Sequence, residues 1–206
     1  MEFDYEHQAS WPHAQAPWES PVALDTAATL SYWQQPHFAM RGFELQLSDK
    51  TATLSGDGSV LLDGREAQFQ QLHFHCGGEH VIDGVRAPFE AHFVHQYADG
   101  ENAVVAVPMS IGAANPTFAE ILTAIGTGDT AYPISLAPLL PDSDYLHYWG
   151  SLTTPPVQEG VAWYVALGKV TMSAEQLSTY QHYFPGDNHR DLQPLAGRPV
   201  LRMRAK

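Results

Sequence analysis

The chain has 206 residues, enough to bury one sizeable hydrophobic core, and we expect a single domain over residues 1–206. Its 23 acidic and 10 basic residues give a formal net charge of −13, which repels nucleic-acid phosphates and anionic membrane surfaces. The longest apolar run, residues 103–109, is far too short to span a bilayer. We therefore expect neither a nucleic-acid partner nor a membrane partner.

The cellular location is predicted from the cysteine content and the first residues. Cys76 is the single cysteine, which excludes an intramolecular disulfide and fits a reducing compartment. The first ten residues carry acidic charge and lack the apolar core of a secretory signal. We expect a cytoplasmic protein, with a periplasmic or secreted location as the alternative if an export signal has been removed.

Short apolar or alternating runs, separated by 15 prolines and 16 glycines, predict a β-rich fold with many turns. Asp57-Gly58 and Asp63-Gly64 predict hairpin turns, and Asp83-Gly84 lies between two of the clearest strand candidates. The expected strands are residues 43–47, 68–75, 89–97, 103–111 and 161–170. Consecutive strands should pair antiparallel.

Two segments are predicted as helices, each opening with capping-box spacing. One opens at Thr117 with Glu120 three residues later, and the other opens at Ser173 with Gln176 and runs to Tyr183. Residues 133–141 are expected to form an irregular connection. The fold class that follows is mainly β (α+β), one domain with a mostly antiparallel sheet and a few short helices.

Histidines gather in one part of the sequence. Five of the eleven lie between positions 73 and 95. In an extended strand alternate side chains share a face, so His73 and His75 point the same way while Phe74 and Cys76 point the other. If the strand after Asp83-Gly84 returns antiparallel, His92 projects beside the first two histidines. Three histidines with one open position are typical of a catalytic zinc site.

Two polar residues that could bond to the proposed ligands support this interpretation. Gln71 and Glu90 each lie two residues before a proposed ligand, hence on the same strand face, and could accept hydrogen bonds from His73 and His92.

Other interpretations of the same residues exist. Histidines on a strand can simply fill polar gaps. His73, His75 and Glu79 also resemble the HxH-x3-E element of a cupin, a β-barrel that would hold iron or manganese. Because Ala67 and Arg86 stand where that element has glycines, the cupin alternative ranks second.

Three ordered segments, residues 71–95, 148–156 and 188–194, resemble the α-class carbonic anhydrase family in its short bacterial form. The resemblance implies a large, twisted central sheet with zinc at the bottom of a cone-shaped cleft. It implies zinc bound by His73, His75 and His92, and outer acceptors at Gln71, Glu90 and the main-chain carbonyl of Asn188. A homodimer is also implied, since bacterial members are often dimers.

The implied reaction is the reversible hydration of carbon dioxide to bicarbonate and a proton, by attack of zinc-bound hydroxide. Thr153 would accept a hydrogen bond from the hydroxide and donate its own proton to Glu79. An apolar wall would hold carbon dioxide, formed by Val94, Val104, Leu152, Val161 and Trp163, with Thr154 beside it. The alternative is a carbonic anhydrase-like binding domain without activity.

The sequence departs from the family pattern at two places. No histidine stands at the expected proton-relay position, which we assign to the segment 40–43 with Arg41 nearest; the relay residue is therefore unknown, with His7, His13 and His37 as candidates. Glu19 replaces the family's glutamine, a change we expect to affect packing more than chemistry.

Overall fold

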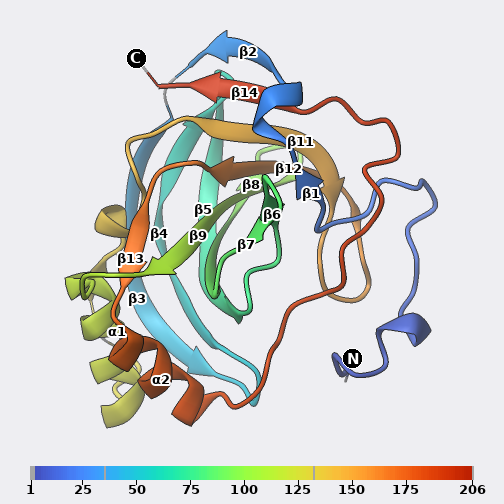
Figure 1. The fold of residues 1–206 in the computed structure, drawn as a ribbon. Helices are drawn as coiled ribbons and strands as arrows, with labels where there is room; N and C mark the ends of the chain where they lie inside the picture. Colours follow the sequence, from blue (N-terminus) through green and yellow to red (C-terminus); the bar gives the residue numbers. More distant parts are fainter. Residues whose placement is uncertain (1–2, 35, 132, 206) are drawn as a thin grey trace.

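The computed structural model describes residues 3–34, 36–131 and 133–205 and is built around one large, curved sheet (Figure 1). Within the described residues this sheet has eleven strands, ordered β10-β3-β4-β5-β8-β9-β12-β11-β14-β2, with β13 paired to β9. Most neighbouring pairs are antiparallel, and β9–β12, β9–β13 and β14–β2 are parallel. The prediction of a mainly β fold with a large, mostly antiparallel sheet is confirmed.

The main-sheet strands are β2 (Leu30–Trp33), β3 (His37–Leu47), β4 (Ala52–Leu62), β5 (Arg65–Cys76), β8 (Phe89–Tyr97), β9 (Asn102–Ile111), β10 (Ile134–Ser135), β11 (Tyr145–Ser151), β12 (Glu159–Ala166), β13 (Val170–Met172) and β14 (Leu201–Arg204). A small sheet contains β1 (Ala23–Leu24), β6 (Val81–Ile82) and β7 (Val85–Arg86). The predicted strand 161–170 is thus two elements, because the chain leaves β12 after Ala166 and re-enters the sheet at Val170.

Two of the three Asp-Gly pairs close hairpins as predicted. Asp63-Gly64 joins β4 to β5 with φ of 50° and 74°, and Asp83-Gly84 joins β6 to β7 with φ of 49° and 78°. The turn predicted at Asp57-Gly58 is wrong, since both residues lie inside β4. Gly58 has φ of 130°, and an added Cβ would come within 1.9 Å of the Ala39 carbonyl oxygen. This glycine therefore permits the close approach of β3 at an irregularity of β4.

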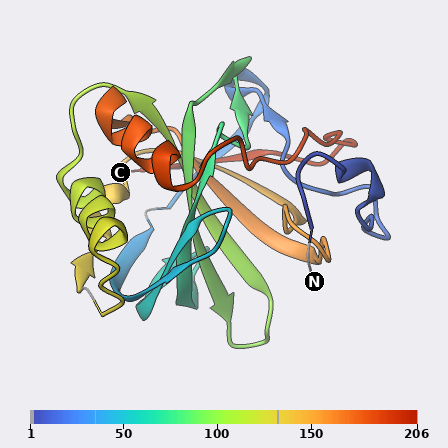
Figure 2. The ribbon, with the colours of Figure 1, turned by 90° about the horizontal axis from the view of Figure 1, so that it is seen from below.

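Two α-helices, α1 (Pro116–Thr127) and α2 (Ala174–Tyr183), lie side by side at one edge of the molecule (Figures 1 and 2). The capping box of Ser173 and Gln176 is confirmed at α2. The cap of α1 is not Thr117 but Asn115, whose side chain accepts from the Phe118 N–H. Pro116 takes the first helical position, where its missing N–H costs nothing.

Three short 3-10 helices complete the described elements: Gln8–Ser10, Thr26–Ala28 and Ala137–Leu139. The last one, together with β10, gives residues 133–141 more regular structure than predicted. Neither α-helix in the described part of the chain is long and apolar enough to cross a membrane.

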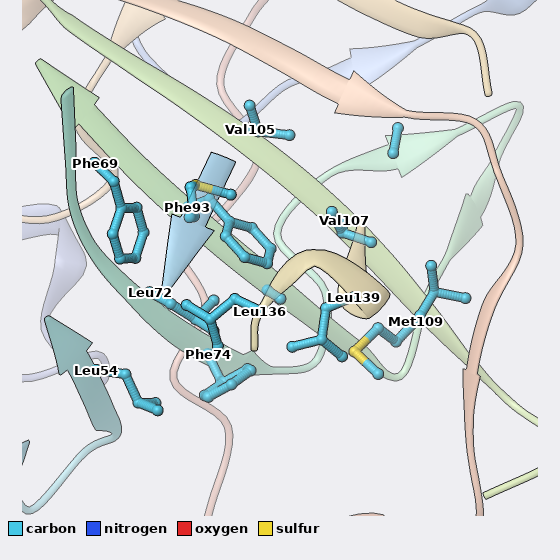
Figure 3. Packing of buried hydrophobic residues seen from close by; sticks show 14 of the residues in the cluster. Leu54, Phe69, Leu72, Phe74, Phe93, Val105, Val107, Met109, Leu136 and Leu139 are labelled. Atoms are coloured by element: carbon cyan, nitrogen blue, oxygen red, sulfur yellow. The ribbon is translucent and has the colours of Figure 1, made fainter. Parts of the chain in front are cut away.

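The two faces of the sheet carry two different apolar clusters. Along β9, Val105 and Val107 belong to the larger cluster, which also contains Leu72 and Phe74 (Figure 3). Val104 belongs to the smaller cluster on the opposite face. Cys76 is in the larger cluster, as the strand alternation predicts. From Gln71 onward, after the irregularity that follows Phe69, the odd-numbered residues of β5 therefore lie on the opposite face, and this face holds the histidines.

Candidate metal centre

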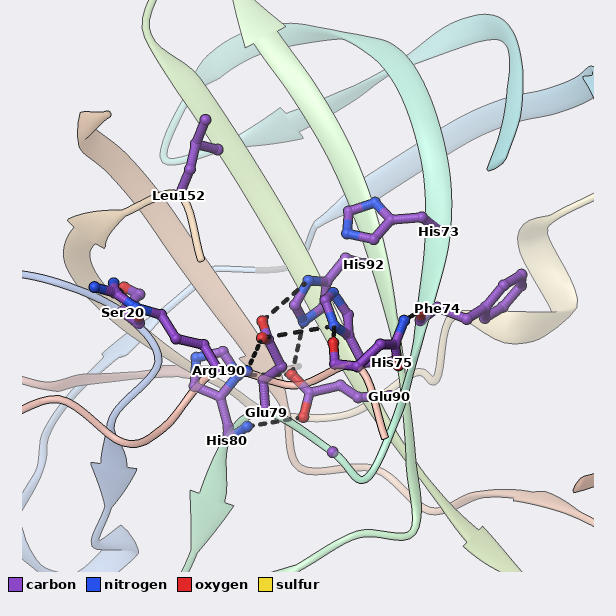
Figure 4. A network of polar contacts seen from close by, with 12 residues as sticks. Ser20, His73, Phe74, His75, Glu79, His80, Glu90, His92, Leu152 and Arg190 are labelled. Atoms are coloured by element: carbon purple, nitrogen blue, oxygen red, sulfur yellow. Dashed lines mark hydrogen bonds and ion pairs between the residues drawn. The ribbon is translucent and has the colours of Figure 1, made fainter. Parts of the chain in front are cut away.

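Strand register brings the three predicted ligands together. β5 and β8 pair antiparallel with His73 directly opposite His92, and His75 follows on the same face of β5. Ring centroids of His73 lie 5.0 Å from His75 and 5.3 Å from His92, and those of His75 and His92 are 4.5 Å apart. One nitrogen from each ring lies within 4.8 Å of the other two. Figure 4 shows the three rings converging.

Each of these histidines uses one ring nitrogen to donate to a protein oxygen. The bonds are His73 Nδ1 to Gln71 Oε1 at 2.9 Å, His75 Nδ1 to the Asn188 carbonyl at 2.7 Å, and His92 Nε2 to Glu90 Oε1 at 2.8 Å. These bonds fix the tautomers and leave Nε2 of His73, Nε2 of His75 and Nδ1 of His92 free as donors of a lone pair. The predicted outer acceptors Gln71, Glu90 and Asn188 are all in place.

The environment keeps His73 and His75 uncharged. Burial lowers the pKa of His73 well below its usual value, and the neighbouring His75 and His92 lower it further. Burial also lowers the pKa of His75, although Glu79 opposes the shift. His75 Nε2 is buried and has no hydrogen-bond partner among the described residues. Three converging imidazoles with such an orphaned nitrogen fit a divalent zinc ion.

Glu90 lies behind His92 and links two histidines. Its Oε1 accepts from His80 Nδ1 at 2.6 Å as well as from His92, and His80 Nε2 lies 2.8 Å from the Tyr148 hydroxyl. Burial opposes ionisation of Glu90, but the contacts with His80 and His92 hold its pKa well below the usual range. The buried carboxylate is therefore an ionised acceptor for His92.

Glu79 lies beside the imidazoles with one oxygen bound and the other free. Its Oε1 accepts from the main-chain N–H of Arg190 at 2.8 Å. Its Oε2 is buried, has no hydrogen-bond partner among the described residues and lies 3.9 Å from His92 Nδ1. The structure brings Thr153 to the same cavity as His73 and His92, but the hydrogen bond expected from Thr153 to Glu79 Oε2 is not formed.

Arg190 and Glu19 form a support for Glu79 that the sequence analysis did not identify. The Arg190 guanidinium donates to the Ser20 carbonyl at 2.9 Å and pairs with the Glu19 carboxylate. Glu19 and Arg190 are both buried. The replacement at Glu19 thus supplies an ion pair and is more than a change of packing. The sequence did carry a signal for this pair: Glu19 is the one charged residue in the segment 19–23.

An apolar cavity of about 200 Å³ adjoins the histidines. Its lining includes the predicted wall residues Val94, Val104, Leu152 and Trp163, together with Thr153 and Thr154. Val161 is not among the lining residues; it is fully buried behind them, in the smaller apolar cluster with Val104 and Trp163. Val161 therefore packs behind the cavity wall and does not line the cavity itself.

A larger, more polar cavity of about 540 Å³ lies on the other side of His73. The β3–β4 loop, residues 48–51, lines it and so reaches the histidines. The side chain of Arg41 lies outside the described part of the structure. Of the relay candidates His7, His13 and His37, none lines either cavity in the described structure.

The comparisons with known proteins agree with this fold. The chain belongs to the eukaryotic-type carbonic anhydrase family, whose model matches residues 5–204. The resemblance to the α class is thereby confirmed. The cupin interpretation is wrong, since the family match and the open sheet exclude a cupin barrel.

Individual relatives give the degree of similarity. A carbonic anhydrase from Pectobacterium carotovorum is 40% identical over 154 residues, which cover 72% of this chain and 63% of that protein. An α-carbonic anhydrase from Thermovibrio ammonificans, solved with the inhibitor sulfanilamide, has a TM-score of 0.82 and 31% identity, covering 90% of this chain and 87% of the other. Dioscorin, solved with ascorbate, has a TM-score of 0.83 and 26% identity, covering 92% and 87%. The chain thus spans less than two thirds of the Pectobacterium protein's length.

Proposed function

We propose that the protein catalyses the reversible hydration of carbon dioxide to bicarbonate and a proton, with zinc held by His73, His75 and His92. The observation that carries this proposal is the convergence of three free ring nitrogens whose opposite nitrogens are already bonded. Such a donor set holds a divalent ion and leaves a corner open for substrate. When bound, zinc supplies the Lewis acidity that activates water for attack near neutral pH.

The chain's own groups bind and orient the reactants. Carbon dioxide is apolar, and the cavity walled by Val94, Leu152 and Trp163 offers it an apolar site next to the histidines. Thr153 lines the same cavity. By donating its proton to the free Oε2 of Glu79, which can only accept, Thr153 would turn its oxygen lone pairs toward the attacking water.

A second candidate is a carbonic anhydrase-like binding domain without activity. The likeness to dioscorin, a protein solved with ascorbate, favours this alternative. A domain that has lost catalysis is expected to have lost a ligand or an orienting group, yet the three histidines, Glu79 and Thr153 are all present. The intact set favours the enzyme.

Metal analysis combined with a stopped-flow hydration assay tests the proposal. We expect close to one zinc per chain and hydration activity that is lost when a chelator removes the metal and returns when zinc is restored. A zinc-loaded protein without hydration activity would support the binding domain. A protein that binds no zinc, with hydration activity unaffected by chelator, would refute the metal centre.

A further inference from the structure

The two cavities that meet at His73 differ in charge. The smaller cavity is walled mainly by apolar side chains, whereas the larger one carries Lys50 and Asp49. Among the described residues that line either cavity, Lys50 has the one permanent positive charge. This is notable because the chain has a formal net charge of −13, which repels anions.

The main chain of Lys50 is fixed relative to the histidines. Asn188 Nδ2 donates to the Lys50 carbonyl at 3.1 Å, and the carbonyl of the same Asn188 accepts from His75 Nδ1. Thr51 Oγ1 donates to the Phe74 carbonyl on β5 at 2.9 Å. Through these bonds the β3–β4 loop and the histidine strand are held together, so the lysine is a fixed part of the cavity wall.

The ammonium group of Lys50 is also held in place. Its Nζ lies 5.3 Å from the centre of the Phe3 ring and 3.1 Å from Asp49 Oδ2. The side chain of Lys50 is 26% exposed, against 80% for Asp49. Water therefore screens the negative charge of Asp49 more strongly than the positive charge of Lys50. Of this pair, Lys50 is therefore the group whose charge acts more strongly on a small anion in the cavity.

We propose that the Lys50 wall of the larger cavity is a binding subsite for small monovalent oxyanions, with bicarbonate as the physiological one. This inference rests on the proposed function, in which neutral carbon dioxide is converted to anionic bicarbonate. The apolar cavity takes the neutral gas, and the Lys50 cavity takes the anion. Lys50 thereby lowers the concentration of bicarbonate that half-saturates a strongly acidic protein.

The experiment compares the zinc-loaded protein with Lys50→Met, Asp49→Asn and the control Lys169→Met, which removes the same charge from an exposed position outside both cavities. Nitrate is titrated while the amide signals of the β3–β4 loop are followed by NMR. The Michaelis constants for bicarbonate and carbon dioxide are measured in parallel. The titration does not depend on activity, so it decides the subsite even if the proposed reaction fails.

We expect Lys50→Met to raise the nitrate Kd and the bicarbonate KM about fivefold at low ionic strength, and less at high salt. Asp49→Asn should lower both, and the KM for carbon dioxide should not change. Equal effects of Lys50→Met and Lys169→Met would overturn the proposal. So would a rise in the carbon dioxide KM as large as that for bicarbonate.

Discussion

The main-chain N–H of Arg190 donates to Oε1 of Glu79 across 2.8 Å, while the guanidinium of the same arginine pairs with buried Glu19. A residue near the N-terminus thus helps to hold a carboxylate beside the imidazoles. Because the Arg190 N–H holds Oε1 of Glu79, the free Oε2 of the same carboxylate lies on the side of His92 (Figure 4).

Replacing Glu19 tests this support. Glu19→Ala leaves the buried guanidinium of Arg190 without its carboxylate, which should lower the free energy of unfolding by about 3 kcal/mol and reduce kcat/KM. Glu19→Gln keeps an acceptor oxygen and should lose less of both. Urea unfolding and a hydration assay measure the two effects. Identical stability of Glu19→Ala and the unchanged protein would contradict the supporting role.

Removing one imidazole tests the ligand set. His92→Ala deletes the one predicted ligand on β8, so bound zinc should fall from about one per chain to a small fraction. His37→Ala, at an exposed position outside both cavities, is the matched control and should keep its zinc. Zinc retained at full stoichiometry after His92→Ala, in a protein that remains folded, would refute the assignment of that ligand.

Filling the apolar cavity should block the substrate without removing the metal. Val94 is partly exposed and lines the cavity of about 200 Å³, so Val94→Phe can place its ring there. We expect kcat/KM for carbon dioxide to fall on the order of tenfold or more, with unchanged zinc content. Val94→Ile adds less volume and should have a smaller effect. Full activity of Val94→Phe would show that carbon dioxide binds elsewhere.

The proton released by hydration has no histidine to carry it from the described cavity walls, other than the ligands themselves. Added imidazole, which titrates near neutral pH, should therefore raise kcat in weakly buffered solution. A bulky buffer of the same pKa that cannot enter the cavity should accelerate the reaction less. A rate independent of imidazole concentration would show that another group exports the proton.

Cys76 should be chemically inert in the folded protein. Burial raises the pKa of its thiol to about 12, so at pH 8 the thiol is protonated and iodoacetamide should label it only after unfolding. In the unfolded chain the thiol loses its proton from a pKa of about 8.5, while the folded thiol keeps it. The free energy of unfolding should therefore fall as pH rises from about 8.5 to about 12, since the unfolded state binds fewer protons there. Cys76→Ala removes this contribution, and rapid labelling of the native protein at pH 8 would contradict it.

Much of the metal centre could be predicted from local sequence because strand geometry is periodic. Alternation along β5 places His73 and His75 on one face, and antiparallel pairing places His92 opposite His73. The same rule explains why Gln71 and Glu90, two residues before a ligand, reach its second nitrogen.

Contacts between distant segments could not be read from the residues alone. Arg190 and Glu79 meet because the segment around Asn188 and Arg190 contacts the histidine strand β5 and the loop that follows it. The turn predicted at Asp57-Gly58 is wrong for a related reason, since the long β3–β4 hairpin turns at residues 48–51. A glycine that permits close strand approach and one that closes a turn look the same in sequence.

The most direct test of the central claim is zinc K-edge X-ray absorption on the active protein. We predict a shell of three imidazole nitrogens at about 2.0–2.1 Å and one further oxygen from a water molecule. A protein carboxylate such as Glu79 in that shell, or only two imidazoles, would contradict the three-histidine centre.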